Sequence, residues 1–501
     1  LQFYQKNWAL LLCMSHKHKP AAPKHIDQPD LTLVLDQGSH ASRLALFTPT
    51  GELLQIDSQA IRSGTQGPFI EQDADEILQS LQQLLQNLKP RLLQRISHSG
   101  ICTQRSTLVA WDRRSGQALS AAISWRDQRA QAQVEQIRQQ GRQAQIHQLS
   151  GLPLSAHYAA SKIHWLLEHN EQVQQALQAQ TLCIAPLASY LLFHLLQQAP
   201  CVIDHSNAQR TQLMDIQTLD WSAQLLELFQ IPTEVLPALC PMLADYGRLK
   251  VADIPLYAVC GDQNALPAAY PPLTPTDCLV NVGTGAFVLS PQPEKPRLQR
   301  LLRSLCYSDA EQVRFLSEGT VNGAGAALDW LSQQFPQPEL YQQLPQWLAK
   351  VSDPPLFINT FAGLGSPWWC DAGEAGFIGA DQLTYPQKYV ALIESIVFLI
   401  SHNLRQLAQP PQRILISGGL SQLDGLCQKL SDLNQASVLR FAQSEASARG
   451  CASLASQLAA HGNSQWQHLP TQQQFRPQKN HGLMQRYAHF VGELRKRCRN
   501  D

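Results

Sequence analysis

Two carboxylates in this chain each follow a short apolar run and stand within two residues of a glycine. Asp36 follows the run 31–35, and Asp262 follows the run 256–260 and one glycine. A carboxylate at a strand end can hold hydrated Mg²⁺, which takes one or two carboxylates and phosphate oxygens, and we assign this chemistry to Asp36. Asp262 suits a base that accepts the proton of a substrate hydroxyl. The alternative for both is a turn-forming Asp beside a Gly.

Polar and aromatic side chains between the two carboxylates suit the recognition of a polyhydroxyl compound. Gln104 and Arg105 can present an amide and a guanidinium to a polyol, and the face of Trp125 can pack against the CH face of a sugar. The alternatives are a surface strand end for the first two residues and a core position for the tryptophan.

Glycine and hydroxyl residues separate two β-rich runs at two places, 31–47 and 279–289, which form a weak internal repeat. Each segment predicts a β-hairpin. Backbone N–H groups at such tips can point at a phosphate, and glycine permits its close approach. The candidate tips are Gly38-Ser39-His40 and Gly283-Thr284-Gly285. Hairpins need glycine in any case, so a structural role is the alternative for each tip.

Several nucleotide and hydrolase motifs are absent from the sequence. It contains no G-x-x-x-x-G-K-[ST], no G-x-G-x-x-G after a strand, no G-x-S-x-G and no H-E-x-x-H. These absences disfavour a Walker-type NTPase, a Rossmann dehydrogenase, an α/β-hydrolase and a zinc protease.

Composition indicates a globular protein with no electrostatic preference for polyanions. The 501 residues include 39 Lys and Arg, 39 Asp and Glu, and 44% hydrophobic residues. Neutral net charge gives no case for nucleic acid or an anionic membrane as a partner. The twelve cysteines include no C-x-x-C pair, so we expect free, mostly buried thiols and a cytoplasmic location.

Strand and helix patterns recur from residue 31 to about residue 460. Apolar spacing over 77–88 predicts a helix capped by Asp73, with Glu76 completing a capping pair. A strand at 414–416, a glycine turn and a helical pattern over 423–433 form an α/β unit. The proline-rich stretch 267–275 predicts a domain boundary.

These patterns predict an unpatterned leader over 1–29, domains over 30–266 and 267–460, and a tail over 461–501 that ends in a solvated basic helix. The apolar run 8–14 within the leader is too short to cross a bilayer.

Seven segments, in order, resemble the FGGY carbohydrate kinases of the actin-like ATPase superfamily, and within them the glycerol kinase branch. The segments are 35–43, 100–129, 204–221, Gly261-Asp262-Gln263, 281–285, 361–367 with 393–395, and Ser417-Gly418-Gly419. The resemblance implies an α/β fold of two ribonuclease H-like domains, with mixed sheets flanked by helices and an active site in the cleft between the domains.

The resemblance also implies transfer of the γ-phosphoryl group of MgATP to a hydroxyl of a small polyol or sugar. Asp262 is then the general base and Asp36 orders Mg²⁺, while Gln104, Arg105, Trp125 and Gln263 face the substrate. Arg43, the two hairpin tips, Gly325, Gly418 and Gly419 lie along the nucleotide. Related kinases form dimers or tetramers, so a homodimer or homotetramer is expected.

Four departures from the glycerol kinase pattern concern the substrate and the nucleotide. Ser106 stands where those enzymes have Glu, and His157 where they have a substrate-binding Tyr. His40 replaces Thr, and Leu423-Asp424 replaces a pair of Asn near the adenine. We therefore expect a larger polyol or a ketose in place of glycerol. The alternatives are a sugar- or nucleotide-binding regulator on the same fold and an actin-like ATPase that acts on protein partners.

Overall fold

The computed structural model describes residues 31–291, 300–370, 372–379, 382–441, 445–460, 466–467 and 469–498. The predicted leader lies outside these residues. The chain forms two compact units, each assembled from separate stretches of sequence. The first comprises Leu1–Tyr270, Ser304–Arg314 and Glu445–His468, and the second comprises Pro271–Arg303, Phe315–Ser444 and Leu469–Asp501.

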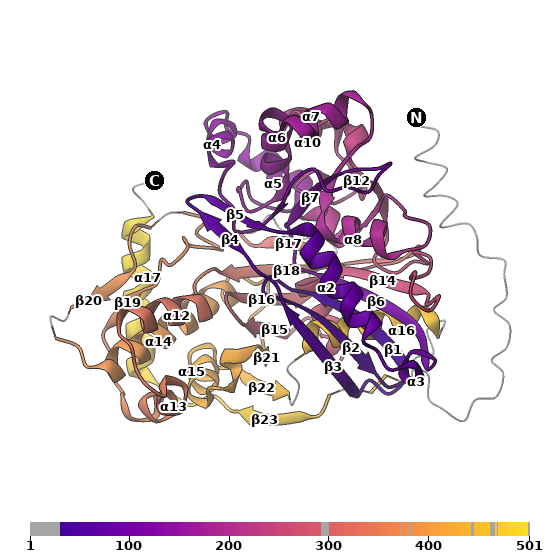
Figure 1. Ribbon diagram of the computed structural model, residues 1–501. Coiled ribbons are helices and arrows are strands. Elements are labelled where there is room, and N and C mark those ends of the chain that lie inside the picture. The colour runs from indigo at the N-terminus through magenta and orange to yellow at the C-terminus, as the bar shows by residue number, and fades with distance from the viewer. Residues whose placement is uncertain are drawn as a thin grey trace. The chain divides into compact units, whose positions relative to one another are not determined.

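The central sheet of the first unit has five strands in the order β14-β6-β1-β2-β3 (Figure 1). They are β14 (Leu256–Gly261), β6 (Ile96–Thr103), β1 (Leu31–Gln37), β2 (Ala41–Phe47) and β3 (Leu53–Ala60). β1 pairs antiparallel with β2, which confirms the predicted first hairpin, and β6 runs parallel to both β1 and β14. Every residue of β1 is buried, as a central strand covered on both faces requires.

Two helices cover opposite faces of this sheet. Leu33 on β1 packs in one core with Leu81 of α2 (Ala74–Gln86), while the next residue, Val34, packs in another with Ala448 of α16 (Ala446–Ala459). Alternate side chains of a strand point to opposite faces, so β1 contributes to both cores. Asp73 caps α2 as predicted.

Glu76 does not form the capping pair with Asp73 that we expected at the start of α2, and its side chain binds Arg62 instead. Its Oε1 accepts a hydrogen bond from Arg62 Nε at 3.0 Å. The residue that precedes the helix therefore acts as the cap by itself, through Asp73 Oδ1, which accepts hydrogen bonds from two backbone N–H groups.

A second five-stranded sheet of the first unit has the order β4-β5-β8-β7-β9, and its neighbouring strands are antiparallel. The strands are β4 (Gly64–Gln66), β5 (Phe69–Gln72), β8 (Ala122–Ile123), β7 (Leu108–Asp112) and β9 (Leu182–Pro186). The short pairs are β10 (Val202–Asp204) with β13 (Ala238–Cys240), and β11 (Met214–Asp215) with β12 (Asp220–Trp221). The helices of this part are α3 (Pro90–Leu93), α4 (Gln131–Gln139), α5 (Gln143–Ser150), α6 (Ala159–His169), α7 (Glu171–Gln178), α8 (Leu187–Leu195), α9 (His205–Gln209), α10 (Ala223–Leu228) and α11 (Asp262–Ala265).

A seven-stranded mixed sheet has the order β17-β18-β16-β15-β21-β22-β23, and all its strands except β17 belong wholly or mainly to the second unit. The strands are β17 (Leu302–Ser308), β18 (Val313–Val321), β16 (Ala286–Pro291), β15 (Asp277–Val282), β21 (Arg413–Ser417), β22 (Ser437–Phe441) and β23 (Thr471–Phe475), with the separate pair β19 (Leu356–Ile358) and β20 (Gly376–Ile378). The helices of the second unit are α12 (Gly325–Gln334), α13 (Leu340–Lys350), α14 (Tyr385–Leu404), α15 (Asp424–Asn434) and α17 (His481–Arg497). β15 and β16 confirm the second predicted hairpin, and β21 followed by α15 confirms the predicted α/β unit.

The C-terminal region is part of the second core, which differs from the solvated tail that we expected. α17 buries five apolar side chains: Leu483, Tyr487, Phe490, Val491 and Leu494. They pack with Phe398 of α14, in the longest helix described. Arg495 and Lys496, in the last turn of the same helix, are exposed, and such basic residues explain why the sequence suggested solvent exposure.

The units also differ from the predicted boundaries because α16 belongs to the first unit. The helix is rich in Ala, with Gly450 so close to Ala265 that a Cβ at this glycine would lie 2.0 Å from its backbone oxygen. Small side chains let α16 approach β1, β6 and β14 closely. After leaving the first unit at Tyr270, the chain thus returns to it twice, over Ser304–Arg314 and again over Glu445–His468, which contains α16.

Cysteine pairing departs from the expectation in one place. Cys370 and Cys498, which α17 brings to a Cα–Cα distance of 6.2 Å, form a disulfide. The other nine cysteines in the described part of the chain carry free thiols.

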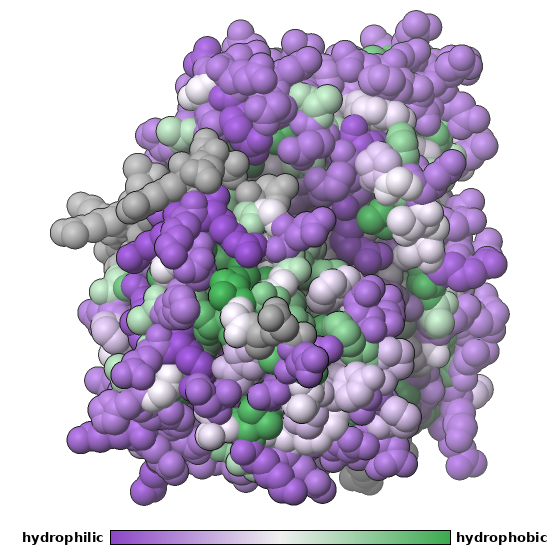
Figure 2. Space-filling model, turned by 90° about the vertical axis from the view of Figure 1, so that its left-hand side faces the viewer, coloured by the Kyte–Doolittle hydropathy of each residue, from purple (hydrophilic) through white to green (hydrophobic). Residues whose placement is uncertain are grey.

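On the face shown in Figure 2, hydrophobic residues form small groups within a mainly hydrophilic surface. Within the described ranges, no helix has both the length and the apolar character needed to cross a bilayer.

Candidate active site

Parallel strands bring the two predicted catalytic carboxylates to one edge of the central sheet. In the register of β1, β6 and β14, Asp36 lies opposite Cys102, and Gly261 lies opposite Thr103. Residues that follow the carboxyl ends of these strands therefore emerge together. They include Gln104 and Arg105 after β6, and Asp262 and Gln263 after β14. The predicted catalytic and substrate-facing groups of three separate segments thus meet in the first unit.

Asp36 is 4% exposed and lies between a cation and a thiol. Arg43 Nη1 is 3.3 Å from its Oδ2, and Cys102 Sγ donates to its Oδ1 at 3.4 Å. Burial raises the pKa of Asp36 to about 6, opposed by the positive charge of Arg43 and reinforced by the negative charge of Asp262. The negative charges of the two carboxylates therefore repel each other.

Asp262 begins α11 directly after β14, and its side chain is 29% exposed. Arg105 Nε lies 3.7 Å from its Oδ1, and Arg105 Nη1 donates to Asn264 Oδ1 at 3.3 Å. A Cβ at Gly261 would lie 2.7 Å from the side chain of Arg105, so glycine makes room for the guanidinium stem. Asp262 thus combines partial exposure with a neighbouring cation, while Gln263 is buried.

Gln104 is 2% exposed and uses its whole amide in internal hydrogen bonds. Its Nε2 donates to Gln37 Oε1 at 3.1 Å and to Gln72 Oε1 at 2.8 Å. Its Oε1 accepts from the hydroxyls of Ser39 and Thr107, each at 3.1 Å. The structure therefore places Gln104 beneath the site, where it holds the first hairpin tip, and not on an open surface.

Ser106 lies in a left-handed backbone conformation with φ of 63° and is fully buried. Its Oγ has no hydrogen-bond partner among the described residues. An unsatisfied buried hydroxyl has a free-energy cost, so this atom remains able to bind a polar group.

Trp125 and His157 lie together, with ring centroids 5.3 Å apart, and both side chains are half-buried. We call these two side chains the aromatic wall. Trp125 Nε1 donates to Ser39 Oγ at 2.9 Å, which links the aromatic wall to the first hairpin tip. Lys162, on α6, contacts the backbone of both aromatic residues.

The first hairpin tip turns at Gly38, whose N–H donates to Ala41 O at 2.9 Å. Ser39 is half-buried beneath the tip, and His40 is exposed. A Cβ at Gly38 would have only an ordinary contact of 3.4 Å, so space does not demand glycine at this position.

The second hairpin tip, in the second unit, is tied to the start of α12. Gly325 N–H donates to Gly283 O, and Ala326 N–H donates to Thr284 O, both at 2.9 Å. A Cβ at Gly325 would lie 2.7 Å from Gly283 O, and one at Gly285 would lie 2.9 Å from Val321 O. Close backbone packing thus requires glycine here, and Thr284 stays exposed at the tip.

The predicted adenosine segment follows β21. Gly418 has φ of +88°, and a Cβ there would lie 2.5 Å from Val282 O, whereas Gly419 is exposed with no atom near its Cβ position. Asp424 stands where the glycerol kinase pattern has Asn, and its Oδ1 accepts a hydrogen bond from Arg440 Nη1 at 2.8 Å.

The donor set suits Mg²⁺ and a nucleotide phosphate. No cluster of three or more His, Cys, Asp or Glu residues suited to a metal occurs in the described part of the chain. Mg²⁺ takes one or two carboxylates and otherwise keeps water and phosphate oxygens, so Asp36 alone is sufficient. A cation would also offset the burial of Asp36 and the negative charge of Asp262, both of which raise the pKa of Asp36. The glycines of the second unit leave backbone groups open to a phosphate.

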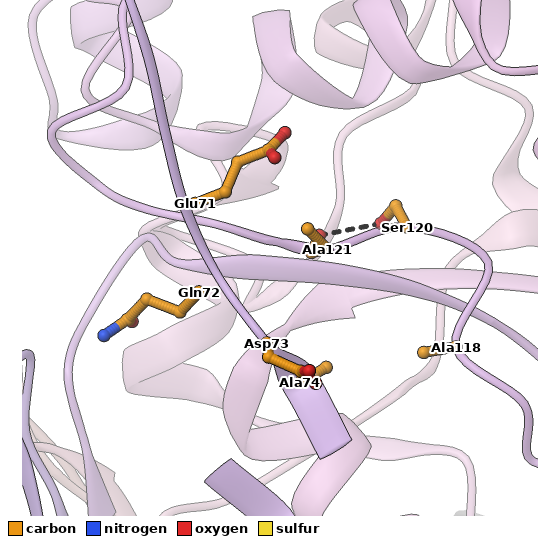
Figure 3. Close-up of a pocket in the computed structure, with 7 residues that line it drawn as sticks. All are labelled: Glu71, Gln72, Asp73, Ala74, Ala118, Ser120 and Ala121. Carbon is orange, nitrogen blue, oxygen red and sulfur yellow. Dashed lines mark hydrogen bonds between the residues drawn. The ribbon is translucent and has the colours of Figure 1, made fainter. Parts of the chain in front are cut away.

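A separate hollow of about 380 Å³ lies at the start of α2 (Figure 3). Its lining residues are Glu71, Gln72, Asp73, Ala74, Ala118, Ser120 and Ala121. Figure 3 shows the side chains of Glu71 and Gln72 pointing to different sides of β5, as neighbouring strand residues do. None of the predicted site residues lines this hollow.

Several residues that shape the site were absent from the sequence-based prediction. Gln37, Gln72 and Asn264 hold Gln104 and Arg105. Cys102 donates to Asp36, and Lys162 binds the Trp125 and His157 segments. The alternation within β1 and β6 could have indicated Gln37 and Cys102. The others depend on contacts between distant segments.

Comparison with known proteins places both parts of the chain in one family. The model of the FGGY family of carbohydrate kinases, N-terminal domain, matches residues 31–258, and that of its C-terminal domain matches residues 278–459. A glycerol kinase of Acinetobacter baylyi is 31% identical over 84% of this chain and 89% of its own length. One of Gluconobacter oxydans is 29% identical over 86% and 87%.

Solved structures show the same fold at lower sequence identity. A Plasmodium falciparum glycerol kinase with ADP has a TM-score of 0.83 at 22% identity and covers 95% of this chain and 99% of its own. A gluconate kinase of Lactobacillus acidophilus has a TM-score of 0.78 at 20% identity, with 94% and 97% covered.

These matches confirm the two-domain α/β fold and the predicted phosphotransferase activity, and they do not favour a regulator without turnover. The reaction uses ATP with Mg²⁺ and phosphorylates a polyol or sugar. The chain belongs to the FGGY family of carbohydrate kinases.

Proposed function

We propose that Asp262 is the general base of this kinase. The observation that carries the proposal is the common sheet edge, where Asp262 is partly exposed and its charge acts on Asp36. Asp262 accepts the proton of the acceptor hydroxyl, and the oxygen forms a bond to the γ-phosphorus as the bond to the ADP oxygen breaks. Phosphoryl transfer depends mainly on positioning and on charge neutralisation.

We propose that Asp36 orders Mg²⁺, which neutralises phosphate charge when bound. Arg43, beside Asp36, then contributes a positive charge to the phosphates, which approach the hairpin tip formed by Gly38, Ser39 and His40. In the second unit, the residues for the nucleotide are Gly283, Thr284, Gly285, Gly325, Gly418 and Gly419. Their support is the close backbone packing that requires glycine at Gly285, Gly325 and Gly418, and the exposure of Thr284 and Gly419.

We infer that the acceptor is a polyol larger than glycerol or a ketose. The supporting features are Ser106, a neutral buried hydroxyl with no hydrogen-bond partner in the described part of the chain, and the aromatic wall of Trp125 and His157. Arg105 and Gln263 complete the substrate side, and Gln104 contributes by positioning Ser39. Relatives and structural neighbours include kinases named for glycerol, gluconate and xylulose.

The direct test is ADP release from MgATP with glycerol, D-xylulose or D-gluconate as acceptor. We expect release that depends on the acceptor, with kcat/KM higher for D-xylulose or D-gluconate than for glycerol. Equal, acceptor-independent release with all three would contradict the proposal.

Ser106→Glu tests the origin of this selectivity. We expect kcat/KM for glycerol, relative to D-xylulose, to rise about tenfold, because a carboxylate accepts hydrogen bonds from small polyols and charged hydrogen bonds contribute about 1.5–3 kcal/mol. Ser106→Ala, which adds no carboxylate, is the control and should leave the ratio unchanged. An unchanged ratio in Ser106→Glu would assign the selectivity to His157 or to another residue of the substrate wall.

We also infer a cytoplasmic location, which the nine free thiols of the described residues support, with Cys370–Cys498 as the exception. A homodimer or homotetramer stays a prediction, which sedimentation of the purified chain will test.

A further inference from the structure

Lys162 is a fully buried cation in the first unit. It lies in the first turn of α6 and has no exposed surface. Its Nζ donates three hydrogen bonds, all to backbone carbonyls: Ser124 O at 2.9 Å, His157 O at 3.1 Å and Trp125 O at 3.4 Å. Every N–H of the ammonium group is therefore used.

The charge of Lys162 is not neutralised by an ion pair. Among the described residues no carboxylate lies within ion-pair distance of its Nζ. Two charged side chains of the loop after β8 affect the pKa of Lys162: Asp127 raises it and Arg129 lowers it. In the loop before α6, the neighbouring titratable side chain is the ring of His157. Asp127 is itself engaged by Arg129, whose Nη2 lies 2.8 Å from its Oδ2. Lys162 thus depends on its three carbonyls.

These carbonyls belong to the two loops that form the aromatic wall. Ser124 and Trp125 follow β8, whereas His157 precedes α6 and is more than 30 residues away in sequence. The rings of Trp125 and His157 meet at 5.3 Å, with their planes at 54°. One ammonium group therefore joins the backbones of both halves of the wall.

The connection requires the protonated amine. An ammonium group has three N–H donors, whereas a neutral amine has two and a lone pair. With three carbonyl oxygens around Nζ, deprotonation places a lone pair against one of them and removes one hydrogen bond. A buried carbonyl without a donor is unfavourable, so the loops separate or admit water.

We propose that Lys162 is a positioning residue that holds the Trp125 and His157 loops together through its ammonium group, and that loss of its proton loosens this wall and weakens carbohydrate binding. The binding part rests on the proposed function, which assigns the wall to the acceptor.

The position of Lys162 sets the pH range of the effect. Burial lowers its pKa to about 7, with Asp127 opposing the shift and Arg129 adding to it. The wall is then intact below pH 7 and loosens as the pH rises above it. Folding has the opposite dependence on this group, because between pH 7 and about 10.4 the unfolded chain binds more protons, so stability rises with pH. Weaker binding at high pH therefore does not follow from unfolding.

The first test observes the wall without any substrate. The full-length protein is labelled with 5-fluorotryptophan, and the Trp125 resonance is assigned by its loss in Trp125→Phe. We expect it to shift between pH 6 and 9 with a midpoint near 7 in the wild type and to stay fixed in Lys162→Met. Because His157 can titrate beside Trp125, the shift must also persist in His157→Gln. A wild-type resonance that does not move, or one that moves equally in Lys162→Met, would overturn the proposal.

The second test measures KM against pH with glycerol, D-xylulose and D-gluconate as probes. For the probe that is phosphorylated, we expect the wild-type KM to rise about tenfold from pH 6 to 8.5, the effect of one lost hydrogen bond to a charged group, while kcat changes less than about threefold. Lys162→Met should have a high KM at both pH values, and the exposed Lys250→Met is the matched control with the wild-type profile.

The outcomes separate this inference from the proposed function. A resonance shift that depends on Lys162, with a flat KM, supports the connection and refutes the assignment of the wall to the acceptor. Phosphorylation of a probe with no Lys162-dependent shift refutes the connection alone. If Lys162→Met does not fold, Lys162→Gln, which cannot titrate in this range, replaces it.

Discussion

At the residue scale, Gln104 shows how a polar side chain serves the site without facing it. Both amide N–H groups and the amide oxygen are used by Gln37, Gln72, Ser39 and Thr107. Because Ser39 also accepts from Trp125, the amide connects the first hairpin tip to the aromatic wall.

Gln104→Glu should break this network, because a carboxylate cannot donate to the amide oxygens of Gln37 and Gln72. We expect the free energy of unfolding to fall by about 2–3 kcal/mol, since two buried acceptors lose their donor. Urea denaturation measures this change. Gln117→Glu, at an exposed position, is the control and should shift it by less than about 0.5 kcal/mol. Equal effects of the two changes would contradict the network.

Residue types could be predicted from the sequence better than their environments. Asp36 and Asp262 were recognisable because each comes at or just after the end of an apolar run and within two residues of a glycine, which is a local pattern. The sequence also singled out Gln104, but its burial depends on Gln72 from another sheet. Lys162 gave no signal, because lysine is rarely fully buried and its carbonyl partners lie in distant loops.

At the element scale, the second hairpin tip and the start of α12 form one tightly packed turn. Gly325 approaches Gly283 so closely that even a methyl group lacks space. Two backbone hydrogen bonds from the first turn of α12 fix the position of this tip.

Gly325→Ala should displace the tip. Overpacking typically costs about 1–3 kcal/mol, and we expect a fall of that size in the free energy of unfolding, with a higher KM for MgATP. Gly376→Ala, where no atom lies within 4 Å of the Cβ position, is the control. Calorimetry and ADP release measure the two effects, and a Gly325→Ala variant with wild-type values for both would refute the role of the tip.

Elements formed by local sequence could be predicted, and their assembly could not. Both hairpins and the helix over 74–86 follow from periodicity and capping. The membership of α16 in the first unit does not, because it depends on small residues that pack against β1 and β14 from far along the chain. The burial of α17 could not be predicted either, because the basic residues in its last turn suggested a solvated helix, whereas its apolar stripe is buried.

At the scale of the whole molecule, buried histidines make both units sensitive to acid. Burial lowers the pKa of His98 and His205 in the first unit, and of His402 in the second, to about 4. The unfolded chain binds protons at these sites near pH 6.5, so stability decreases as the pH falls from 6.5 towards 4. The raised pKa values of Asp36 and Asp204, about 6 each, act in the opposite sense.

His98→Gln isolates one of these contributions. His98 is 8% exposed, its ring stacks on that of Tyr257, and it forms hydrogen bonds with the neutral hydroxyls of Thr32, Ser97 and Ser456. The wild type should lose about 3 kcal/mol more stability than the variant between pH 6.5 and 4, from a pKa difference of about 2.5 units. Denaturant unfolding at several pH values measures this difference. Parallel pH dependences for the two proteins would show that His98 does not contribute.

The central claim is that Asp262 takes the proton of the acceptor hydroxyl, and Asp262→Asn tests it most directly. The amide keeps the size of the side chain and removes its basicity. The measurement is ADP release from MgATP with the accepted carbohydrate, with Asp253→Asn, whose side chain is 61% exposed, as the control. The account predicts a decrease in kcat of at least about 10²-fold in Asp262→Asn, with KM for MgATP retained and the control unaffected. Turnover that is equal in the wild type and Asp262→Asn would contradict it.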